Sequence, residues 1–241
     1  MNTQPRLVEV RQKVLKQNDV VARALRQRFR DEGVFVVSLV SSPGTGKTAF
    51  LEKLLLLTRE KYRSAALVGD LATENDADRL RRSAVPVKQI NTGTVCHLEA
   101  EMVRNALEGW APPSLEVLFI ENVGNLVCPS SYDLGEDLRL VLMSVTEGED
   151  KPLKYPTIFN TADVAVITKM DLAIAVEFDA AAAERSIQTV RPGMRIFGVS
   201  AKTGQGMAAF MSFLEGAIAQ SAFAAPAAVP SPDGTAASSA V

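Results

Sequence analysis

The stretch SSPGTGKT at residues 41–48 carries the groups that bind the phosphates of a nucleotide. Its two glycines allow backbone N–H groups to turn inward toward phosphate oxygens, and a helix that begins here adds the positive end of its dipole. Lys47 can reach the β and γ phosphates, and the Thr48 hydroxyl is a ligand for Mg²⁺, which offsets charge during phosphoryl transfer. Ser41 stands where the usual pattern has its first glycine. The expected phosphate-binding residues are Pro43, Gly44, Thr45, Gly46, Lys47, Thr48 and Ala49.

Two later segments could select the base of the nucleotide. The stretch AVITKMD ends in Thr168, Lys169 and Asp171, and Ser200, Ala201 and Lys202 follow the next apolar segment. The Asp171 carboxylate can accept hydrogen bonds from the ring imino and exocyclic amino groups of guanine, which adenine does not present in that arrangement. Lys169 would lie along the base, and Ala201 would offer its backbone N–H. The usual pattern begins with Asn where this chain has Thr168. These residues predict binding of GTP and GDP.

Two acidic residues follow short apolar segments and could hold Mg²⁺ and orient the attacking water. Asp70 lies in GDLATENDADR, and Glu121 lies in IENVGN. A carboxylate at a strand end beside a phosphate loop suits this work, so we predict Lys47, Asp70 and Glu121 as catalytic residues and Thr48, Asp70 and Glu121 as Mg²⁺ ligands. The sequence leaves open which carboxylate binds Mg²⁺ directly. Alternatively, Asp70 caps a helix and Glu121 lies in a solvated loop. Gly124 could donate its N–H to the γ-phosphate and move when that phosphate leaves.

A third group of residues could bind a soft metal ion. The chain has one histidine and two cysteines: Cys96 and His97 are adjacent, and Cys128 lies shortly after Gly124. Thiolate and imidazole suit Ni²⁺ or Zn²⁺, whereas Mg²⁺ prefers oxygen. Since three ligands do not close a site, it is either open for transfer or shared across a symmetric dimer. The alternative is that the Cys96 and His97 side chains are buried structural groups.

An α/β fold must position these residues, because short apolar segments alternate with segments of helical character. Residues 34–40 are apolar and β-branched, which indicates a strand buried on both faces, and an amphipathic helix is expected over residues 49–62. Further strands are expected at 65–68, 87–90, 117–120, 138–145, 164–167 and 196–199. The pattern predicts a P-loop NTPase three-layer sandwich: a mainly parallel sheet with helices on both faces and ligands beyond the carboxyl ends of the strands.

The two ends of the chain differ from this alternation. Between residues 7 and 29, apolar side chains recur at helical spacing and the other faces are basic, which suits a solvated surface or an acidic partner. Gly33 is expected to end that helix in the left-handed conformation. The last residues are rich in Ala, Pro and Ser and are expected to be disordered. The predicted organisation is a basic helix in 1–32, a GTPase domain with metal-binding loops in 33–220, and a tail in 221–241.

Composition limits the classes of partner. Across 241 residues, 26 Lys and Arg oppose 28 Asp and Glu, so no global basic field exists to hold nucleic acid. No apolar run approaches the roughly 20 residues needed to cross a bilayer, and no secretory signal is evident. We therefore expect a cytoplasmic protein with reduced thiols that uses neither nucleic acid nor a membrane as partner.

From about residue 14 to residue 214 the chain resembles the HypB family, GTPases that help to insert nickel into NiFe hydrogenase. The segments that carry the resemblance are SSPGTGKT, GDLATENDADR, QINTGTVCHLEA, LFIENVGNLVCPSSYDLGED, SVTEGEDKPLKYP, TKMD and SAKTGQGM. The related urease GTPases have Cys-Pro-His in the metal loop, whereas Cys96 and His97 are adjacent here, which favours the hydrogenase branch. The amino-terminal cysteine-rich motif and the histidine-rich stretch of some members are missing, so nickel storage is not expected.

The resemblance implies that Cys96, His97 and Cys128 form the metal site and that GTP promotes a homodimer. It also implies a nickel-carrying HypA-like partner, which the basic helix could contact, and the hydrogenase large subunit as receiver. The leading hypothesis is a metallochaperone with slow Mg²⁺-dependent GTP hydrolysis. The alternative is an assembly GTPase for another metalloenzyme, such as urease or a cobalamin enzyme, with structural Cys and His. A small-molecule kinase is a third possibility, but it would have no use for a guanine site.

Overall fold

The computed structural model describes residues 4–70 and 75–224. Within them, seven strands form one sheet in the order β3-β2-β4-β1-β5-β6-β7, and every pairing is parallel. The strands are β1 (Phe35–Ser41), β2 (Ser64–Asp70), β3 (Val87–Asn91), β4 (Val117–Glu121), β5 (Leu138–Ser144), β6 (Val164–Thr168) and β7 (Arg195–Gly198). The expected strands are confirmed, and no end differs from the prediction by more than two residues.

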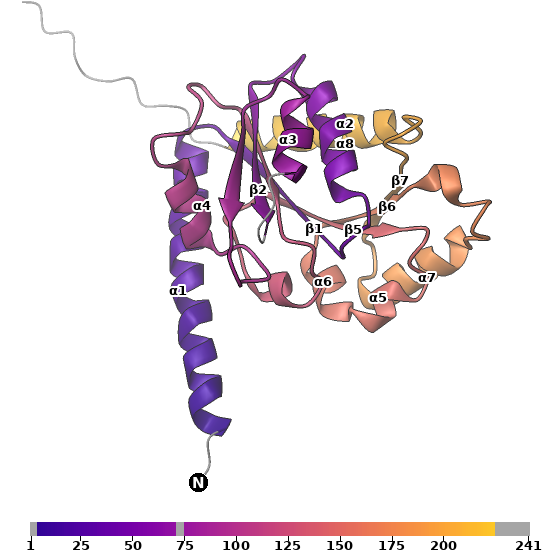
Figure 1. Cartoon of the computed structure of the whole chain (residues 1–241), viewed down its shortest axis with the longest axis horizontal. Coiled ribbons are helices and arrows are strands. Elements are labelled where there is room, and N and C mark those ends of the chain that lie inside the picture. Colours follow the sequence, from indigo (N-terminus) through magenta and orange to yellow (C-terminus); the bar gives the residue numbers. More distant parts are fainter. Residues whose placement is uncertain (1–3, 71–74, 225–241) are drawn as a thin grey trace, which may run out of the picture.

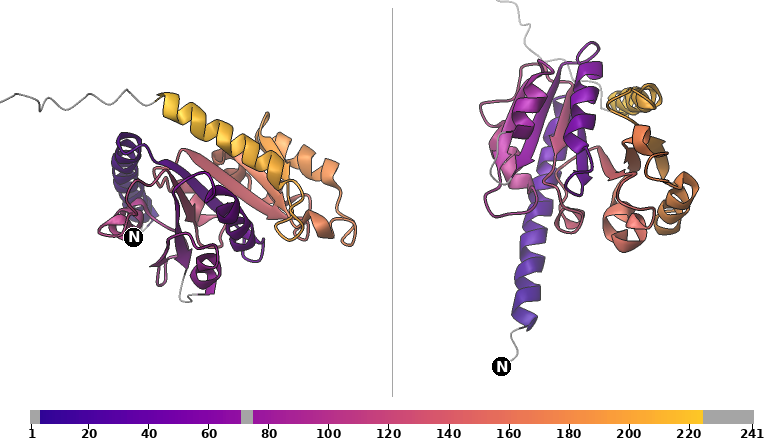
Figure 2. Two further views of the ribbon diagram at one scale, coloured as in Figure 1. Left: turned by 90° about the horizontal axis from the view of Figure 1, so that it is seen from above. Right: turned by 45° about the vertical axis from the view of Figure 1, so that its right-hand side comes forward.

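Helices cover both faces of the sheet, so the predicted three-layer sandwich is confirmed (Figures 1 and 2). α2, α3 and α8 lie on one face, while α1 and α4 cover one end of the other face and α5, α6 and α7 cover its opposite end. The helices are α1 (Gln4–Asp31), α2 (Lys47–Thr58), α3 (Asn75–Arg81), α4 (Ala100–Leu107), α5 (Lys151–Lys154), α6 (Pro156–Thr161), α7 (Ala180–Val190) and α8 (Met207–Ala224), with 3-10 turns η1 (Cys128–Ser131) and η2 (Met170–Leu172).

Strand β1 shows how the sequence builds three layers. All seven of its residues are buried, as expected for a central parallel strand. Its side chains point alternately to the two faces: Val37 and Leu39 pack toward α2 and α8, Val36 packs toward α1 and α4, and Val40 packs toward α6 and α7. An apolar run without polar alternation is therefore required, since both faces of β1 lie in the core.

The second half of the long helix α1 packs beside the sheet and α4 (Figure 1). Val21, Leu25 and Phe29 are buried, but Val14 is 41% exposed, so the expected apolar face is not buried along its whole length. Gly33 has φ of 69° and ends the helix in the left-handed conformation as predicted. At the other end of the chain α8 continues to residue 224, four residues into the range predicted as a tail. Residues 225–241 lie outside the described part, as do 71–74 of GDLATENDADR.

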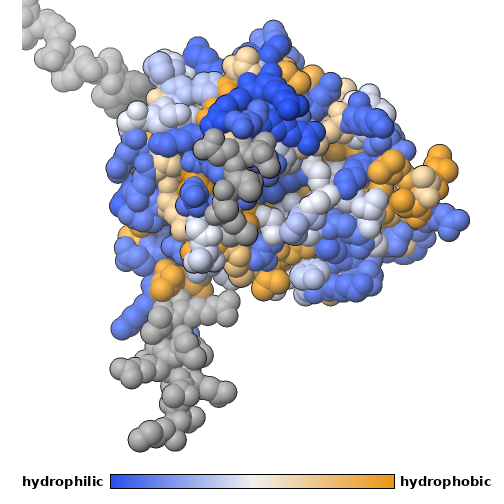
Figure 3. Space-filling model, viewed as in Figure 1, coloured by the Kyte–Doolittle hydropathy of each residue, from blue (hydrophilic) through white to orange (hydrophobic). Residues whose placement is uncertain are grey.

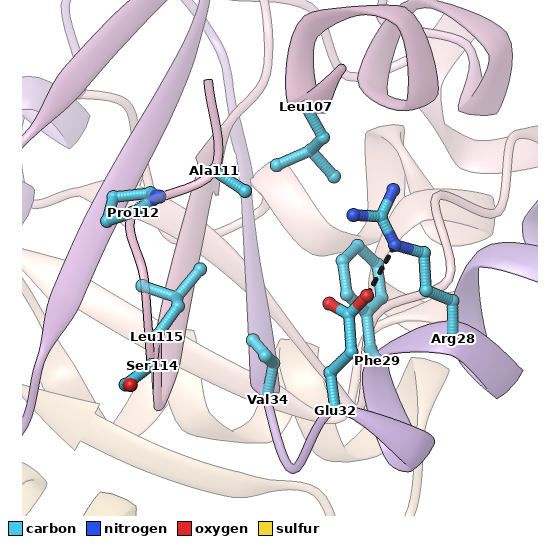
Figure 4. Close-up of a pocket in the computed structure, with 9 residues that line it drawn as sticks. All are labelled: Arg28, Phe29, Glu32, Val34, Leu107, Ala111, Pro112, Ser114 and Leu115. Atoms are coloured by element: carbon cyan, nitrogen blue, oxygen red, sulfur yellow. Dashed lines mark hydrogen bonds and ion pairs between the residues drawn. The ribbon is translucent and has the colours of Figure 1, made fainter. Parts of the chain in front are cut away.

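A cavity of about 250 Å³ lies where α1 ends, against the segment after α4 (Figure 4). It is bordered by residues at the amino ends of β1 and β4, including Val34 and Leu115. The charged side chains in it, Arg28 and Glu32, are bonded to each other at 2.8 Å. This cavity is thus at the opposite end of the strands from the predicted nucleotide residues, and its guanidinium already has an anionic partner.

Candidate functional site

The phosphate loop connects β1 to α2 and has the conformation that its glycines allow. Gly44 and Gly46 have φ of 75° and 92°, values that other residues rarely adopt. Helix α2 begins at Lys47 directly after Gly46, and no side chain caps its first turn. The sequence-based expectation of a helix over 49–62 was therefore wrong at both ends, since α2 spans Lys47–Thr58. Lys47 and Thr48 lie in this first turn, where free N–H groups and the helix dipole favour an anion.

Glu121, the last residue of β4, meets the first turn of α2. Its Oε1 accepts a hydrogen bond from Thr48 Oγ1 at 2.7 Å and lies 3.1 Å from Lys47 Nζ. Glu121 is only 1% exposed, so the alternative of a solvated loop is wrong. Its other oxygen, Oε2, is buried without a hydrogen-bond partner among the described residues. A buried carboxylate oxygen with this vacancy beside a threonine hydroxyl fits the oxygen ligands that Mg²⁺ prefers.

Asp70 and Gly124 approach the same edge from neighbouring segments. Asp70 ends β2, two residues beyond Val68, which is in register with Glu121 on the adjacent strand. Gly124 follows β4 and lies against the phosphate loop, because a Cβ on it would be 3.1 Å from the Cα of Pro43. The loop after β4 therefore touches the phosphate loop at a position where a side chain would have to push Pro43 away.

A separate pocket of about 250 Å³ lies between the first turn of α2 and the ends of β6 and β7. Asp171 in this pocket accepts a hydrogen bond from Ser200 Oγ at 2.6 Å, which orients its carboxylate. Thr168 donates to the backbone oxygen of Thr45 at 2.6 Å, and Lys169 donates to that of Gly44 at 2.7 Å. Thr168, which replaces the usual Asn, thus binds the phosphate loop. The lining residues are Gly46, Ala49, Phe50, Thr168, Lys169, Asp171, Leu172, Val199, Ala201 and Lys202.

Glu147 is a residue at this edge that the sequence interpretation missed. It follows β5 in SVTEGED, and its carboxylate contacts the side chains of Ser42 and Thr45 in the phosphate loop. It also accepts hydrogen bonds from Ser144 N at 2.7 Å and from Lys151 Nζ at 3.0 Å. The stretch KPLKYP, whose function the sequence left open, is therefore connected to the phosphate loop through Glu147. Its position just beyond the carboxyl end of the buried strand β5 could have identified Glu147 as a site residue from the sequence.

The contacts of Glu147 predict a pH-dependent contribution to stability. Burial alone would raise the pKa of this carboxyl, but hydrogen bonds from Ser42, the Ser144 N–H and Lys151 hold its pKa below the ordinary value. The stabilisation is therefore complete above the unfolded-state pKa of about 4.3 and is lost as pH falls through the lower folded-state pKa. At pH 7 we expect Glu147→Gln to lower the free energy of unfolding by about 1–3 kcal/mol.

Urea unfolding of the wild type and Glu147→Gln between pH 7 and pH 3 would measure this effect. The difference between the two proteins should shrink below about pH 4. Glu184→Gln, which removes an exposed carboxylate from α7, controls for the change in net charge. A difference that stayed constant down to pH 3 would contradict the lowered pKa of Glu147.

Cys96, His97 and Cys128 come together at one place, although they belong to different segments. Cys96 and His97 precede α4, and Cys128 begins η1 after β4. One ligand atom from each residue lies within 4.8 Å of the others, and the two sulfur atoms are 3.0 Å apart without a disulfide. A spacing of this kind allows the three side chains to bind one ion.

The environment of His97 keeps a lone pair available. Burial lowers the pKa of the His97 imidazole below its ordinary value, and the neighbouring Glu99 carboxylate opposes this shift only in part. The Nε2 atom is 3.5 Å from Glu99 Oε1, too long for a good hydrogen bond, and neither ring nitrogen has a hydrogen-bond partner among the described residues. The ring packs against Tyr132, with centroids 4.0 Å apart. A neutral buried imidazole without hydrogen bonds fits a metal ligand.

Two asparagines connect this cluster to the nucleotide edge. Asn122, directly after Glu121, accepts a hydrogen bond from the backbone N–H of Leu98 at 3.0 Å. Asn125 donates to the backbone oxygen of Cys96 at 3.4 Å and accepts from the N–H of Val127 at 2.8 Å. The segment from Glu121 to Cys128 therefore touches the phosphate loop through Gly124 and the segment of Cys96 and His97 through its two asparagines. It ends in the third metal ligand, Cys128.

The chain is similar in sequence to a known protein family. Residues 35–198 match the family described as the CobW/HypB/UreG nucleotide-binding domain. Over 88% of this chain and 71% of the relative, the sequence is 44% identical to the hydrogenase maturation factor HypB of Rhizobium leguminosarum bv. viciae.

The chain belongs to the HypB family.

Solved structures of HypB proteins have the same fold. A HypB from Helicobacter pylori in complex with nickel superposes on this HypB-family chain with a TM-score of 0.80 and 41% identity, covering 85% of this chain and 96% of that one. A more distant likeness, to the signal recognition particle 54 kDa protein of Aeropyrum pernix K1 in complex with GDP, has a TM-score of 0.54 at 17% identity. It covers 78% of this chain and 49% of that one, and it supports the fold alone.

Proposed function

We propose that this HypB-family protein is a GTP-hydrolysing nickel metallochaperone that supports nickel insertion into NiFe hydrogenase. The observation that carries the proposal is the close approach of Cys96, His97 and Cys128 on segments bonded to the nucleotide edge. The name of the Rhizobium leguminosarum relative, a hydrogenase maturation factor, and the nickel complex of the Helicobacter pylori protein support it. Nickel is the cargo, and hydrolysis of GTP controls its transfer.

In this proposal each group at the edge has a separate task. Asp171 selects guanine, and the Lys47 ammonium offsets charge on the β and γ phosphates. Thr48, Asp70 and Glu121 would hold Mg²⁺, which when bound offsets the charge that develops on the phosphates. The Gly124 N–H would donate to the γ-phosphate and lose this hydrogen bond when that phosphate leaves. The loop from Glu121 to Cys128 could then move and shift the metal ligand Cys128. Turnover is expected to be slow, about 10⁻⁴ to 10⁻³ s⁻¹, as in small GTPases without an activating partner.

We also propose that GTP promotes a homodimer. An apolar surface follows Asp171 in the chain, made by Leu172, Ile174 and Val176, and Ile174 is 94% exposed. In Figure 3 hydrophobic side chains gather at the right-hand edge, where Figure 1 places the segment between β6 and α7. Exposed apolar side chains beside a ligand site favour a protein partner there. A second copy could also supply the further ligands that the three-residue metal site lacks.

The remaining partners are proposed on the family likeness. A HypA-like nickel protein could bind the basic faces of α1, and the hydrogenase large subunit would receive the metal. No helix in residues 4–70 and 75–224 is long and apolar enough to cross a membrane. We expect the protein to act in the cytoplasm, where thiols remain reduced and available to metal.

Titration of Ni²⁺ into the wild type and Cys128→Ala, with GDP or a non-hydrolysable GTP analogue, tests the proposal. Loss of one thiolate from a three-ligand site should weaken binding by more than about tenfold, since even outer-shell changes cost 10- to 100-fold. The wild-type affinity should also change with the nucleotide, and light scattering followed in parallel should show a dimer with the GTP analogue. Val127→Ala, at a neighbouring residue that is 62% exposed, is the matched control.

Nickel binding that is independent of Cys128 and of nucleotide would refute the metallochaperone. The protein would then be an assembly GTPase whose Cys and His are structural, the second candidate. The buried position of His97 is the observation that favours that candidate. Titration with Zn²⁺ under the same conditions would show which of the two metals the site prefers.

A further inference from the structure

Asn18 of α1 is a buried polar side chain on a helix that carries none of the predicted nucleotide or metal residues. It is 6% exposed, and both ends of its amide are hydrogen-bonded. The Nδ2 atom donates to the backbone oxygen of Asp133 at 2.8 Å, and Oδ1 accepts from the backbone N–H of Ala100 at 2.9 Å. One side chain therefore connects two segments that are remote from it and from each other in sequence.

Each of these segments carries metal-site residues. Ala100 is the first residue of α4 and follows His97 by three positions, so its N–H is one of the donors that the helix itself cannot satisfy. Asp133 directly follows Tyr132, whose ring packs on His97, and comes shortly after Cys128. Asn18 thus holds the segment with Cys96 and His97 and the segment with Cys128 at a fixed separation.

Other contacts hold the segment after Cys128 against α1. Arg26 donates to Asp133 Oδ1 at 2.6 Å. Gly135 packs so closely that a Cβ on it would be 3.0 Å from the backbone oxygen of Ala22. Because α1 is a continuous helix, Asn18 and Arg26 form one rigid support behind the metal-ligand segments.

We propose that Asn18 is a positioning residue for the nickel site, which sets the separation between Cys96 and Cys128 by bridging the segments that carry them. The inference rests on the proposed metal site and adds to it a support from outside the nucleotide-binding edge. Asn18 does not touch the ligand side chains in the described contacts and acts on them through the backbone. It follows that the metal site requires α1, even though Cys96, His97 and Cys128 all lie outside that helix.

The test uses the full-length protein with Asn18→Ala, which removes both bonds, and Asn18→Asp, a near-isosteric change that keeps an acceptor for Ala100 N. In Asn18→Asp a carboxylate replaces the donor to the Asp133 carbonyl. Gln17→Ala changes the exposed neighbouring amide of α1 and is the matched control. Two readouts report on ligand position: the thiolate-to-nickel charge-transfer spectrum with Ni²⁺ affinity, and the rate at which diamide oxidises Cys96 and Cys128 to a disulfide in the metal-free protein.

We expect both Asn18 variants to bind a GTP analogue normally, to bind Ni²⁺ about tenfold more weakly with an altered spectrum, and to form the disulfide more slowly. A role in stability alone would lower the melting temperature and leave the spectrum and the oxidation rate unchanged, which would overturn the inference. If the wild type bound no Ni²⁺, the proposed function would fail. The oxidation rates would then still decide whether Asn18 sets the separation of the two sulfur atoms.

Discussion

Asp171→Asn should abolish the preference for guanine nucleotides. The Asp171 carboxylate, oriented by Ser200 at 2.6 Å in the pocket at the ends of β6 and β7, can accept both donors of the guanine edge. An amide offers one acceptor and places its own donors against the second guanine donor. One charge-assisted hydrogen bond becomes a neutral one, and the other is lost and leaves a guanine donor unpaired. At about 1.5–3 kcal/mol for each change, GTP binding should weaken by about 10² to 10⁴-fold.

Xanthine nucleotides provide the complementary measurement for this variant. Xanthine has a carbonyl in place of the guanine amino group, so it can accept a hydrogen bond from the new amide. Fluorescent GTP, XTP and ATP analogues titrated against the wild type and Asp171→Asn should show GTP affinity falling while XTP affinity rises. Ser200→Ala, which removes the hydroxyl that orients the carboxylate and keeps Asp171 itself, should weaken GTP binding without improving XTP binding. An unchanged GTP affinity in Asp171→Asn would mean that the base binds elsewhere.

Lys47→Ala should reduce GTP hydrolysis by about 10² to 10³-fold, the cost of removing one group that stabilises charge in a transition state. The Lys47 ammonium is in the first turn of α2 and lies 3.1 Å from Glu121 Oε1. Its removal also leaves the Glu121 carboxylate buried without its cation, which typically costs 3–5 kcal/mol for a buried pair. The variant should therefore be both inactive and less stable.

A second substitution separates these two effects. Glu121→Gln added to Lys47→Ala removes the stranded charge, so the melting temperature should recover in part while hydrolysis stays low. Phosphate release under single-turnover conditions and thermal unfolding would measure the two quantities. Lys53→Ala, which removes a lysine from the partly exposed side of the same helix, serves as the charge control. Hydrolysis by Lys47→Ala within threefold of the wild type would refute the role of this lysine.

Local sequence determined the elements and the edge where ligands bind. Apolar runs such as FVVSLV can be buried on both faces only in a central parallel strand, so the strands were predictable to within one or two residues. Gly44 and Gly46 predicted the turn into α2, because glycine readily adopts positive φ, and both residues have positive φ in the structure. The nucleotide-binding and metal-binding residues could be proposed from their side-chain chemistry, since each ligand prefers particular donor atoms.

Contacts between remote segments were decided only by the tertiary structure. Glu147 reaches Ser42 and Thr45 because β5 lies next to β1 in the sheet, an order that no local pattern contains. Burial of Glu121 depends on the packing of α2 over β4, and the bridge made by Asn18 depends on the docking of α1 against two distant loops. Polar side chains such as these give no periodic signal. Their partners are set by strand order and helix packing, which are properties of the whole chain.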